Sequence, residues 1–181
     1  MKTPVKTITI LAVSVLVTTF LTASKPADAG DIIYIHPWTD EVTITTHQHA
    51  VILHGWGACT RGLTEDGIRG SRIEVILTFE GEIVQQISPR QASTLWSAPS
   101  IWDANLDMCM FPALHTWKAT WQSNRLHLAR VGDYDMVFST TPLEPLIDGM
   151  DGMDGNDPDG HLDVYQDPWV HHTTIHVVEQ P

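Results

Sequence analysis

Short runs in which apolar and polar residues alternate are the feature that most constrains the fold of this chain. The clearest run is residues 72–79, where Ile73, Val75, Leu77 and Phe79 alternate with arginine, glutamate, isoleucine and threonine. Because successive side chains of a strand point to opposite faces of the sheet, this spacing predicts a strand with one buried face. A chain made of such runs has to bury them against a second sheet or a helix.

Comparable runs recur along the chain, with turn residues between them. Six further segments are expected to contain strands, and they are residues 42–45, 50–53, 82–87, 114–122, 131–138 and 171–179. Glu80 and Gly81 predict a tight hairpin, since glycine readily adopts the positive φ that such turns require. Helical patterning is confined to residues 63–68, which could form one turn. The pattern therefore predicts an all-β fold, namely an antiparallel β-sandwich.

One of these segments resembles a strand of a known family. Residues 131–138 place a glycine turn just before Tyr134, and they are similar to the penultimate strand of immunoglobulin-like sandwiches. The resemblance implies an immunoglobulin-like fold in which the Tyr134 hydroxyl bonds back to the backbone at the corner. The cysteine that is usual two residues later is Met136 here. Any disulfide of this chain is therefore not the inter-sheet bridge of antibody domains.

The first 29 residues have the pattern of an export signal. A basic start precedes an apolar stretch, residues 8–21, and Ala27-Asp28-Ala29 fits a small-residue cleavage site. The apolar stretch is shorter than the roughly 20 residues that cross a bilayer, so cleavage is favoured over an uncleaved membrane anchor. We expect a signal peptide at 1–29 and a single sandwich domain at 30–181. The expected location is secreted or periplasmic, outside the cytoplasm, with no membrane attachment after cleavage.

The chain contains two cysteines, Cys59 and Cys109. In an exported protein the default for two thiols is a disulfide, because the compartment is oxidising. The alternative is a nucleophilic Cys59, which the tight Gly55-Trp56-Gly57-Ala58 setting suggests. We expect the disulfide.

The formal net charge of −12 is concentrated near the C-terminus. Residues 148–167 hold seven aspartates and no lysine or arginine, and they form a long acidic loop before the last strand. Clustered Lys and Arg, which phosphate contacts require, are absent, so nucleic-acid binding is not expected. We expect a bound calcium ion to neutralise part of the negative charge of these carboxylates. The alternative is a solvated acidic loop without a bound ion.

Part of this loop resembles known calcium-binding repeats. The D-x-D-G-x-x-D pattern of residues 157–163 is similar to the repeats of thrombospondin type 3 and dockerin modules. The resemblance implies that alternating aspartates wrap a Ca²⁺ ion, with a glycine at the sharp bend. The candidate metal ligands are Asp154, Asn156, Asp157, Asp159, Asp163 and Asp167.

Two other sites are alternatives. His47 and His49 are spaced to share one face of a strand, as in zinc and copper sites and similar to the H-x-H of carbonic anhydrases, and such a metal protein could be an enzyme. Surface or partly buried histidines are the simpler interpretation. Trp96 and Trp102, in the long middle loop, could stack on sugar rings and make the chain a carbohydrate-binding module. Trp117 and Trp121 share a strand face and are expected to fill the core.

Recognisable catalytic motifs are missing from the sequence. There is no G-x-S-x-G elbow, no glycine-rich phosphate loop and no H-E-x-x-H. A glycine-rich loop of like charges is also a poor place to keep one carboxyl protonated for glycoside hydrolysis. The expected function is that of a secreted, non-enzymatic, calcium-binding sandwich module with an adhesion, recognition or accessory role and a carbohydrate or protein ligand.

Overall fold

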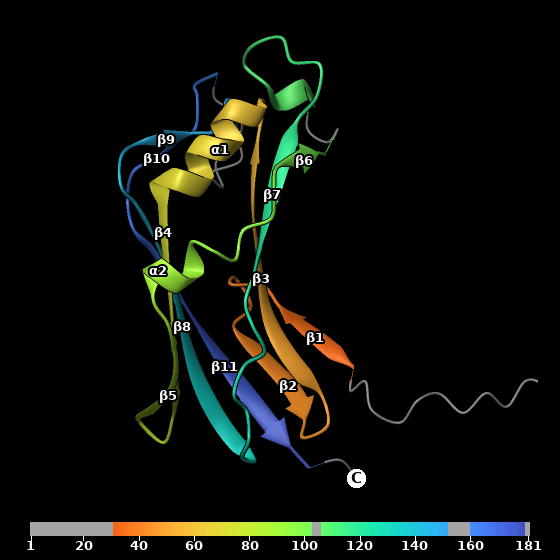
Figure 1. Ribbon diagram of the computed structural model, residues 1–181, viewed down its shortest axis with the longest axis vertical. Coiled ribbons are helices and arrows are strands. Elements are labelled where there is room, and N and C mark those ends of the chain that lie inside the picture. Colours follow the sequence, from red (N-terminus) through yellow and green to blue (C-terminus); the bar gives the residue numbers. More distant parts are fainter. Residues whose placement is uncertain (1–30, 103–105, 152–159, 180–181) are drawn as a thin grey trace, which may run out of the picture. The chain divides into compact units, whose positions relative to one another are not determined.

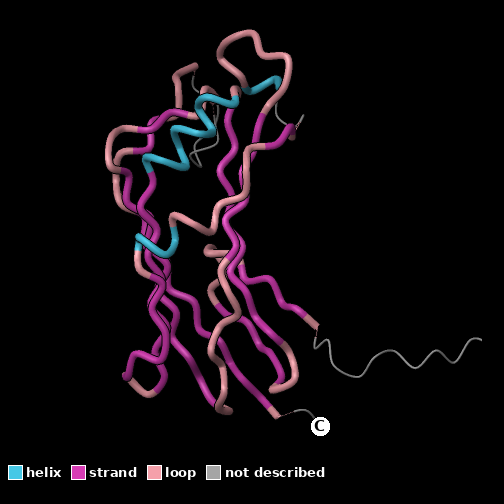
Figure 2. The backbone as a smooth tube through the Cα atoms, viewed as in Figure 1, coloured by secondary structure: helices cyan, strands magenta, loops and turns pink. Residues whose placement is uncertain are grey.

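The computed structural model describes residues 31–102, 106–151 and 160–179, and these fold mainly into β-sheet (Figure 1). Magenta strand covers most of the tube in Figure 2, and helix is confined to a few short stretches. The expected signal peptide, residues 1–29, lies outside the described residues. In the part of the chain that is described, no helix is both long and apolar enough to cross a membrane.

The first sheet has four strands in the order β1-β3-β7-β6. Their bounds are Ile32–Ile35 for β1, His49–Ala58 for β3, Trp117–Gln122 for β7 and Ser100–Ile101 for β6. The long strand β3 organises this sheet, because its first half pairs with β1 and its second half with β7.

The second sheet has five strands in the order β2-β11-β8-β4-β5. Their bounds are Glu41–Thr45 for β2, Trp169–Val178 for β11, Gly132–Pro142 for β8, Ser71–Phe79 for β4 and Glu82–Ile87 for β5. Glu80 (φ 53°) and Gly81 (φ 81°) both adopt positive φ between β4 and β5, as a tight two-residue hairpin turn requires. The predicted hairpin is confirmed.

The two sheets pack face to face around one core (Figure 1). Trp121 from β7 and Phe138 from β8 are fully buried, and their ring centroids lie 5.8 Å apart across the interior. The alternation predicted for residues 72–79 is confirmed, because all four apolar residues of one face are buried. Burying a large side chain of this kind contributes roughly 1.5–3 kcal/mol, so this interior is the main source of stability.

Both sheets are mixed, and the expectation of purely antiparallel pairing is wrong at two places. Strand β1 runs parallel to β3, and β2 runs parallel to β11. The chain leaves the first sheet after β1, adds β2 to the second sheet and returns for β3. Because β2 and its flanking turns serve as the crossover, β1 and β3 can lie side by side in the same direction.

Helix α1 spans Arg61–Gly70 and is longer than the single turn that the sequence suggests. The Thr60 hydroxyl caps it by accepting a hydrogen bond from the Leu63 N–H at 3.2 Å. Gly67 lies where any side chain would meet the Trp56 ring, and Gly70 lies where one would meet Leu146. These glycines therefore weaken the helix signal in the sequence but allow the helix to pack closely on its neighbours.

The remaining elements are short. They are helix α2 at Pro89–Ala92, a 3-10 turn at Leu106–Met108, strand β9 at Leu146–Ile147 and strand β10 at Val164–Tyr165. The last two pair antiparallel as a separate two-stranded sheet.

The predicted tyrosine corner is present. The Tyr134 hydroxyl accepts a hydrogen bond from the Arg130 N–H at 2.9 Å and donates to the Arg130 carbonyl at 3.2 Å. Tyr134 is 1% exposed, and its ring packs against Phe79 with centroids 4.6 Å apart. One hydroxyl therefore satisfies both backbone groups of the turn that leads into β8.

Replacing Tyr134 with phenylalanine is expected to lower the free energy of unfolding by about 2 kcal/mol, because two backbone groups lose their partner. Urea denaturation measures this change. The matched control is Tyr34→Phe, which removes a hydroxyl from a residue that is 51% exposed and should change stability little. Equal effects of the two substitutions would contradict a structural role for the corner.

Candidate metal centre

The acidic loop is closed at its root by the small β9–β10 sheet. Ile147 pairs with Val164, and Leu146 pairs with Tyr165. The chain therefore enters and leaves the loop at adjacent points, although the sixteen residues 148–163 lie between the two strands in the sequence. Leu146 is buried against α1, which anchors this root to the rest of the fold.

Two aspartates at this root are buried. Asp148 is 2% exposed and Asp163 is 6% exposed. One carboxylate oxygen of Asp148 accepts from the Met150 N–H at 2.8 Å, and the other accepts from the Tyr165 hydroxyl at 3.1 Å. The Asp163 N–H donates to the Met150 carbonyl at 3.1 Å. Two buried carboxylates at the closed end of an acidic loop make this root the candidate cation site.

Burial raises the pKa of Asp148 above its usual value, and it is the largest influence on this carboxyl. The hydrogen bonds from Met150 and Tyr165 oppose the rise, whereas the negative charge of Asp163 adds to it. The carboxylate form of Asp148 is thus disfavoured by its surroundings, and a cation bound beside it would offset both unfavourable effects.

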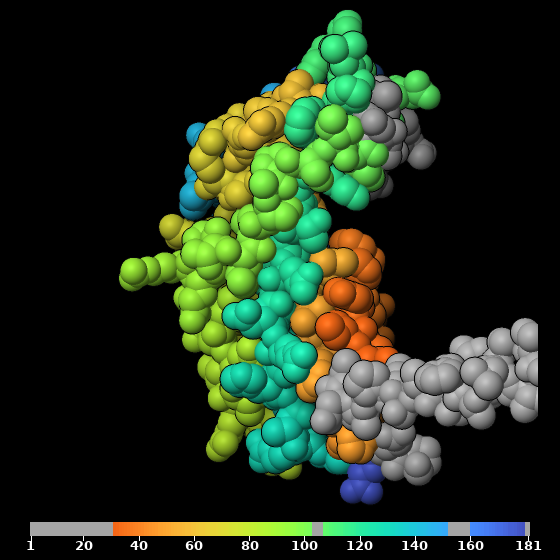
Figure 3. All heavy atoms as spheres, turned by 45° about the vertical axis from the view of Figure 1, so that its right-hand side comes forward, coloured from red at the N-terminus to blue at the C-terminus, as the bar shows by residue number. Residues whose placement is uncertain are grey.

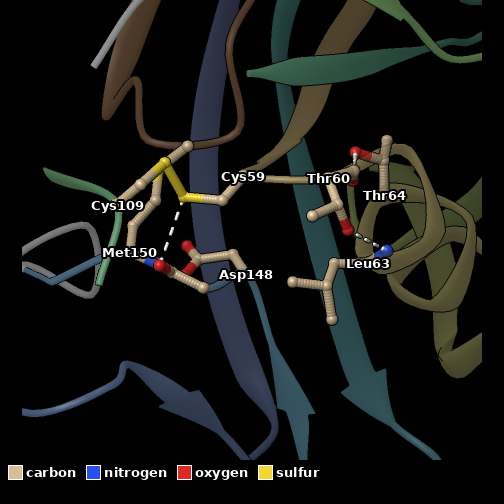
Figure 4. Close-up of a disulfide and its surroundings, with 8 residues drawn as sticks. Cys59, Thr60, Leu63, Thr64, Cys109, Asp148 and Met150 are labelled. Atoms are coloured by element: carbon tan, nitrogen blue, oxygen red, sulfur yellow. Dashed lines mark hydrogen bonds between the residues drawn. A yellow bond between two sulfur atoms is a disulfide. The ribbon is translucent and has the colours of Figure 1, made fainter. Parts of the chain in front are cut away.

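The predicted disulfide between Cys59 and Cys109 is confirmed, with Cα atoms 5.8 Å apart. It lies beside Asp148 and Met150, as Figure 4 shows, and a sulfur of Cys59 is 3.2 Å from the Gly149 carbonyl. The alternative of a nucleophilic Cys59 is therefore wrong for this structure. A disulfide is compatible with a protein outside the cytoplasm.

Backbone hydrogen bonds fix the loop root to both ends of the disulfide. The Cys59 N–H donates to the Asp148 carbonyl at 2.8 Å, and the Met110 N–H donates to the Gly149 carbonyl at 3.0 Å. The Asp151 N–H donates to the Met108 carbonyl at 3.0 Å. Residues 148–151, the first four of the acidic loop, are consequently held by backbone hydrogen bonds on both sides of the disulfide.

The structure places only part of the predicted ligand set. Asp154, Asn156, Asp157 and Asp159 lie outside the described residues. Asp163 is buried at the root, whereas Asp167 is exposed between β10 and β11. Among the described residues, no three His, Cys, Asp or Glu side chains are grouped so that they could hold a metal ion.

Sequence reasoning missed two residues of this root. Asp148 follows the buried pair Leu146-Ile147, and that position at the end of an apolar dipeptide was the available signal. Asp151 accepts a hydrogen bond from the Gly160 N–H at 2.9 Å, across the loop. No local pattern distinguishes it from the other aspartates.

The predicted strand pair of histidines is not formed. His47 lies in the turn after β2, and His49 begins β3, so they do not share a strand face. Elsewhere, His176 on β11 lies 2.7 Å from Asp133 on β8, and this hydrogen bond raises the pKa of His176. His171 lies 3.4 Å from Asp40.

Among the described histidines, His54 is the one whose pKa is shifted most strongly by its surroundings. Its ring lies between Phe138, at 5.3 Å between centroids, and Trp96, at 6.0 Å. Burial lowers the pKa of His54 to about 4. The residue keeps some exposed surface, but its Nδ1 atom is fully buried and has no hydrogen-bond partner among the described residues.

The two loop tryptophans lie on opposite faces of the first sheet. Trp96 faces the interior, where it contacts His54. Trp102 covers the outer face at Gly57, where an added Cβ would come within 2.8 Å of the ring. They do not form one stacking platform. Trp121 fills the core as predicted, and the Trp117 ring lies 5.9 Å from the Arg61 guanidinium.

Comparisons with known proteins add little to this geometry. No protein-family model matches the chain, and no curated protein matches it. Among solved structures, the chain is similar to a cysteine protease inhibitor from Entamoeba histolytica, with 8% sequence identity and a TM-score of 0.34. The similarity covers 83% of this chain and 98% of the inhibitor. The fold and root together define a disulfide-bonded protein of mixed β-sheets with buried carboxylates.

Proposed function

We propose that this chain is an exported module of the immunoglobulin-like sandwich class that binds calcium through its acidic loop. Two face-to-face sheets and the Tyr134 corner support the class. Calcium binding would stabilise the module for a non-enzymatic role in adhesion, recognition or as an accessory to another protein.

The observation that carries the calcium proposal is the burial of Asp148 and Asp163 at the loop root. Calcium prefers six to eight oxygen ligands, and carboxylates from both ends of one loop can supply several of them. The remaining oxygens would come from Asp154, Asn156, Asp157, Asp159 and Asp167. A divalent cation would offset the desolvation of the two buried carboxylates and the repulsion between them.

Calcium at 100 times its dissociation constant is expected to stabilise the protein by about 2.7 kcal/mol, which corresponds to a melting temperature roughly 5–10 °C higher than in EGTA. Calorimetry with calcium or EGTA measures the difference. Asp163→Asn and Asp148→Asn should each remove most of it, since each removes a charged oxygen ligand. Asp135→Asn, on the exposed face of β8, is the matched control and should keep it.

Native mass spectrometry at millimolar calcium gives the independent test. A protein that stays empty under these conditions, with the same melting temperature in EGTA, would overturn the proposal. Should Asp163→Asn fail to fold, Asp148→Asn carries the comparison, because each variant tests one end of the same loop.

A further inference from the structure

A groove of about 360 Å³ lies where strand β5 meets helix α2 and the extended segment 123–130. Figure 3 shows these parts side by side, with β5 and α2 in yellow-green and green and the extended segment in teal. Its polar lining includes Gln85, Gln91, Thr94, Asn124, Arg125 and His127. All of these residues are described. The groove is separate from the candidate metal centre, because no lining residue belongs to the acidic loop.

One glutamine fixes the width of this groove. The Gln85 side chain donates to the Arg125 carbonyl at 3.4 Å and accepts from the His127 N–H at 2.8 Å. Leu126, between them, is 8% exposed and its N–H donates to the Ala50 carbonyl at 2.9 Å. Because Leu126 points into the core, Arg125 and His127 on either side of it both point outward and are exposed.

The opposite wall is fixed by helix α2. The Gln91 side-chain oxygen accepts from the Ser88 N–H at 3.0 Å, which caps the helix, and the Thr94 hydroxyl donates to the Gln91 carbonyl at 2.8 Å. Ile87 and Leu95 add apolar surface to the lining. The groove is therefore built by side chains that the fold already holds in place.

The charge of the groove is opposite to that of the chain. No aspartate or glutamate lines it, although the formal net charge of the chain is −12. Glu74 is not a lining residue, but its carboxylate accepts a hydrogen bond at 2.7 Å from Gln86, which is one. Across residues 31–102, 106–151 and 160–179, the Arg125 guanidinium has no ion-pair partner. A planar guanidinium binds a carboxylate through two parallel hydrogen bonds.

We propose that this groove binds a carboxylate-bearing sugar, with Arg125 holding the carboxylate. Pockets for apolar ligands are lined mostly by hydrophobic side chains, whereas seven of the nine residues that line this groove carry an amide, hydroxyl, imidazole or guanidinium group. Side-chain amides and hydroxyls both donate and accept hydrogen bonds, which matches sugar hydroxyls, and Gln91, Asn124 and Thr94 supply such groups. Ile87 and Leu95 would contact the C–H face of the ring.

The test is a titration with trigalacturonate, followed by NMR chemical shifts and calorimetry in EGTA at low salt. EGTA removes calcium, so the result is independent of the proposed calcium function. We expect binding that weakens as salt is added, with shift changes at β5, α2 and residues 124–127. Uncharged maltotriose should bind much more weakly because it has no carboxylate.

Arg125→Gln is expected to weaken trigalacturonate binding about 10- to 100-fold, and Arg125→Lys by less, because lysine keeps the charge but not the paired hydrogen bonds. Arg90→Gln is the matched control, since Arg90 lies on α2 but outside the lining. Equal affinity of Arg125→Gln and wild type, or equal binding of maltotriose, would overturn the proposal. So would binding of triglutamate with no response to the sugar.

Discussion

Replacing both Cys59 and Cys109 with alanine is expected to lower the free energy of unfolding by about 4 kcal/mol. The disulfide joins residues 50 positions apart. Closing a loop of that length lowers the conformational entropy of the unfolded chain, and this loss corresponds to about 4 kcal/mol. Cys59 is also 1% exposed, so the substitution removes well-packed atoms. Urea denaturation of the variant and the oxidised wild type measures the difference.

A reducing agent provides the control for this prediction. It should bring the wild type close to the variant and leave the variant unchanged, because the variant has no bond to break. Hydrogen exchange should also accelerate at the amides of Met110 and Asp151, because their N–H groups donate to the Gly149 and Met108 carbonyls beside the disulfide. A loss of less than about 1 kcal/mol would show that these hydrogen bonds hold the root without the disulfide.

The strands that sequence reasoning located correctly are those whose signal is local. In β4 an apolar residue stands at every second position, at Ile73, Val75 and Leu77, because one face is fully buried and the other is more exposed. The turn before Tyr134 likewise predicts its hydrogen bonds to Arg130, since the partners are only four residues apart. These features depend on residues that are close together in the sequence, so the sequence alone is enough to predict them.

The features that were missed depend on distant residues. Strand β1 is continuously apolar rather than alternating, and its parallel partner β3 is reached only through a crossover in the other sheet. Helix α1 contains Gly67 because Trp56 occupies the space of a side chain there. At the root of the acidic loop, Asp148 and Asp163 are brought to the same end of the loop by the pairing of β9 with β10. Each case is decided by tertiary packing, which overrides local propensity.

Lowering the pH from 7 to 4 is expected to destabilise the protein by about 3 kcal/mol through His54. The pKa of His54 is about 4 in the folded protein and 6.5 in the unfolded chain, so the unfolded chain takes up the proton first. The contribution of neutral His54 is complete above pH 6.5 and is lost as the pH falls towards 4. The cause is burial beside Phe138 and Trp96, where an imidazolium would lose its hydration.

The variant His54→Phe isolates this contribution, because phenylalanine keeps a planar ring but cannot take up a proton. Between pH 7 and 4 its free energy of unfolding, from urea denaturation, should fall by about 3 kcal/mol less than that of the wild type. The raised pKa of Asp148 acts in the opposite direction and is present in both proteins, so it cancels. The exposed His172 provides the control variant His172→Phe, which should follow the wild type. Identical pH profiles for His54→Phe and the wild type would mean that the folded protein accommodates a charged His54, and the aromatic enclosure would then have to open to water in acid.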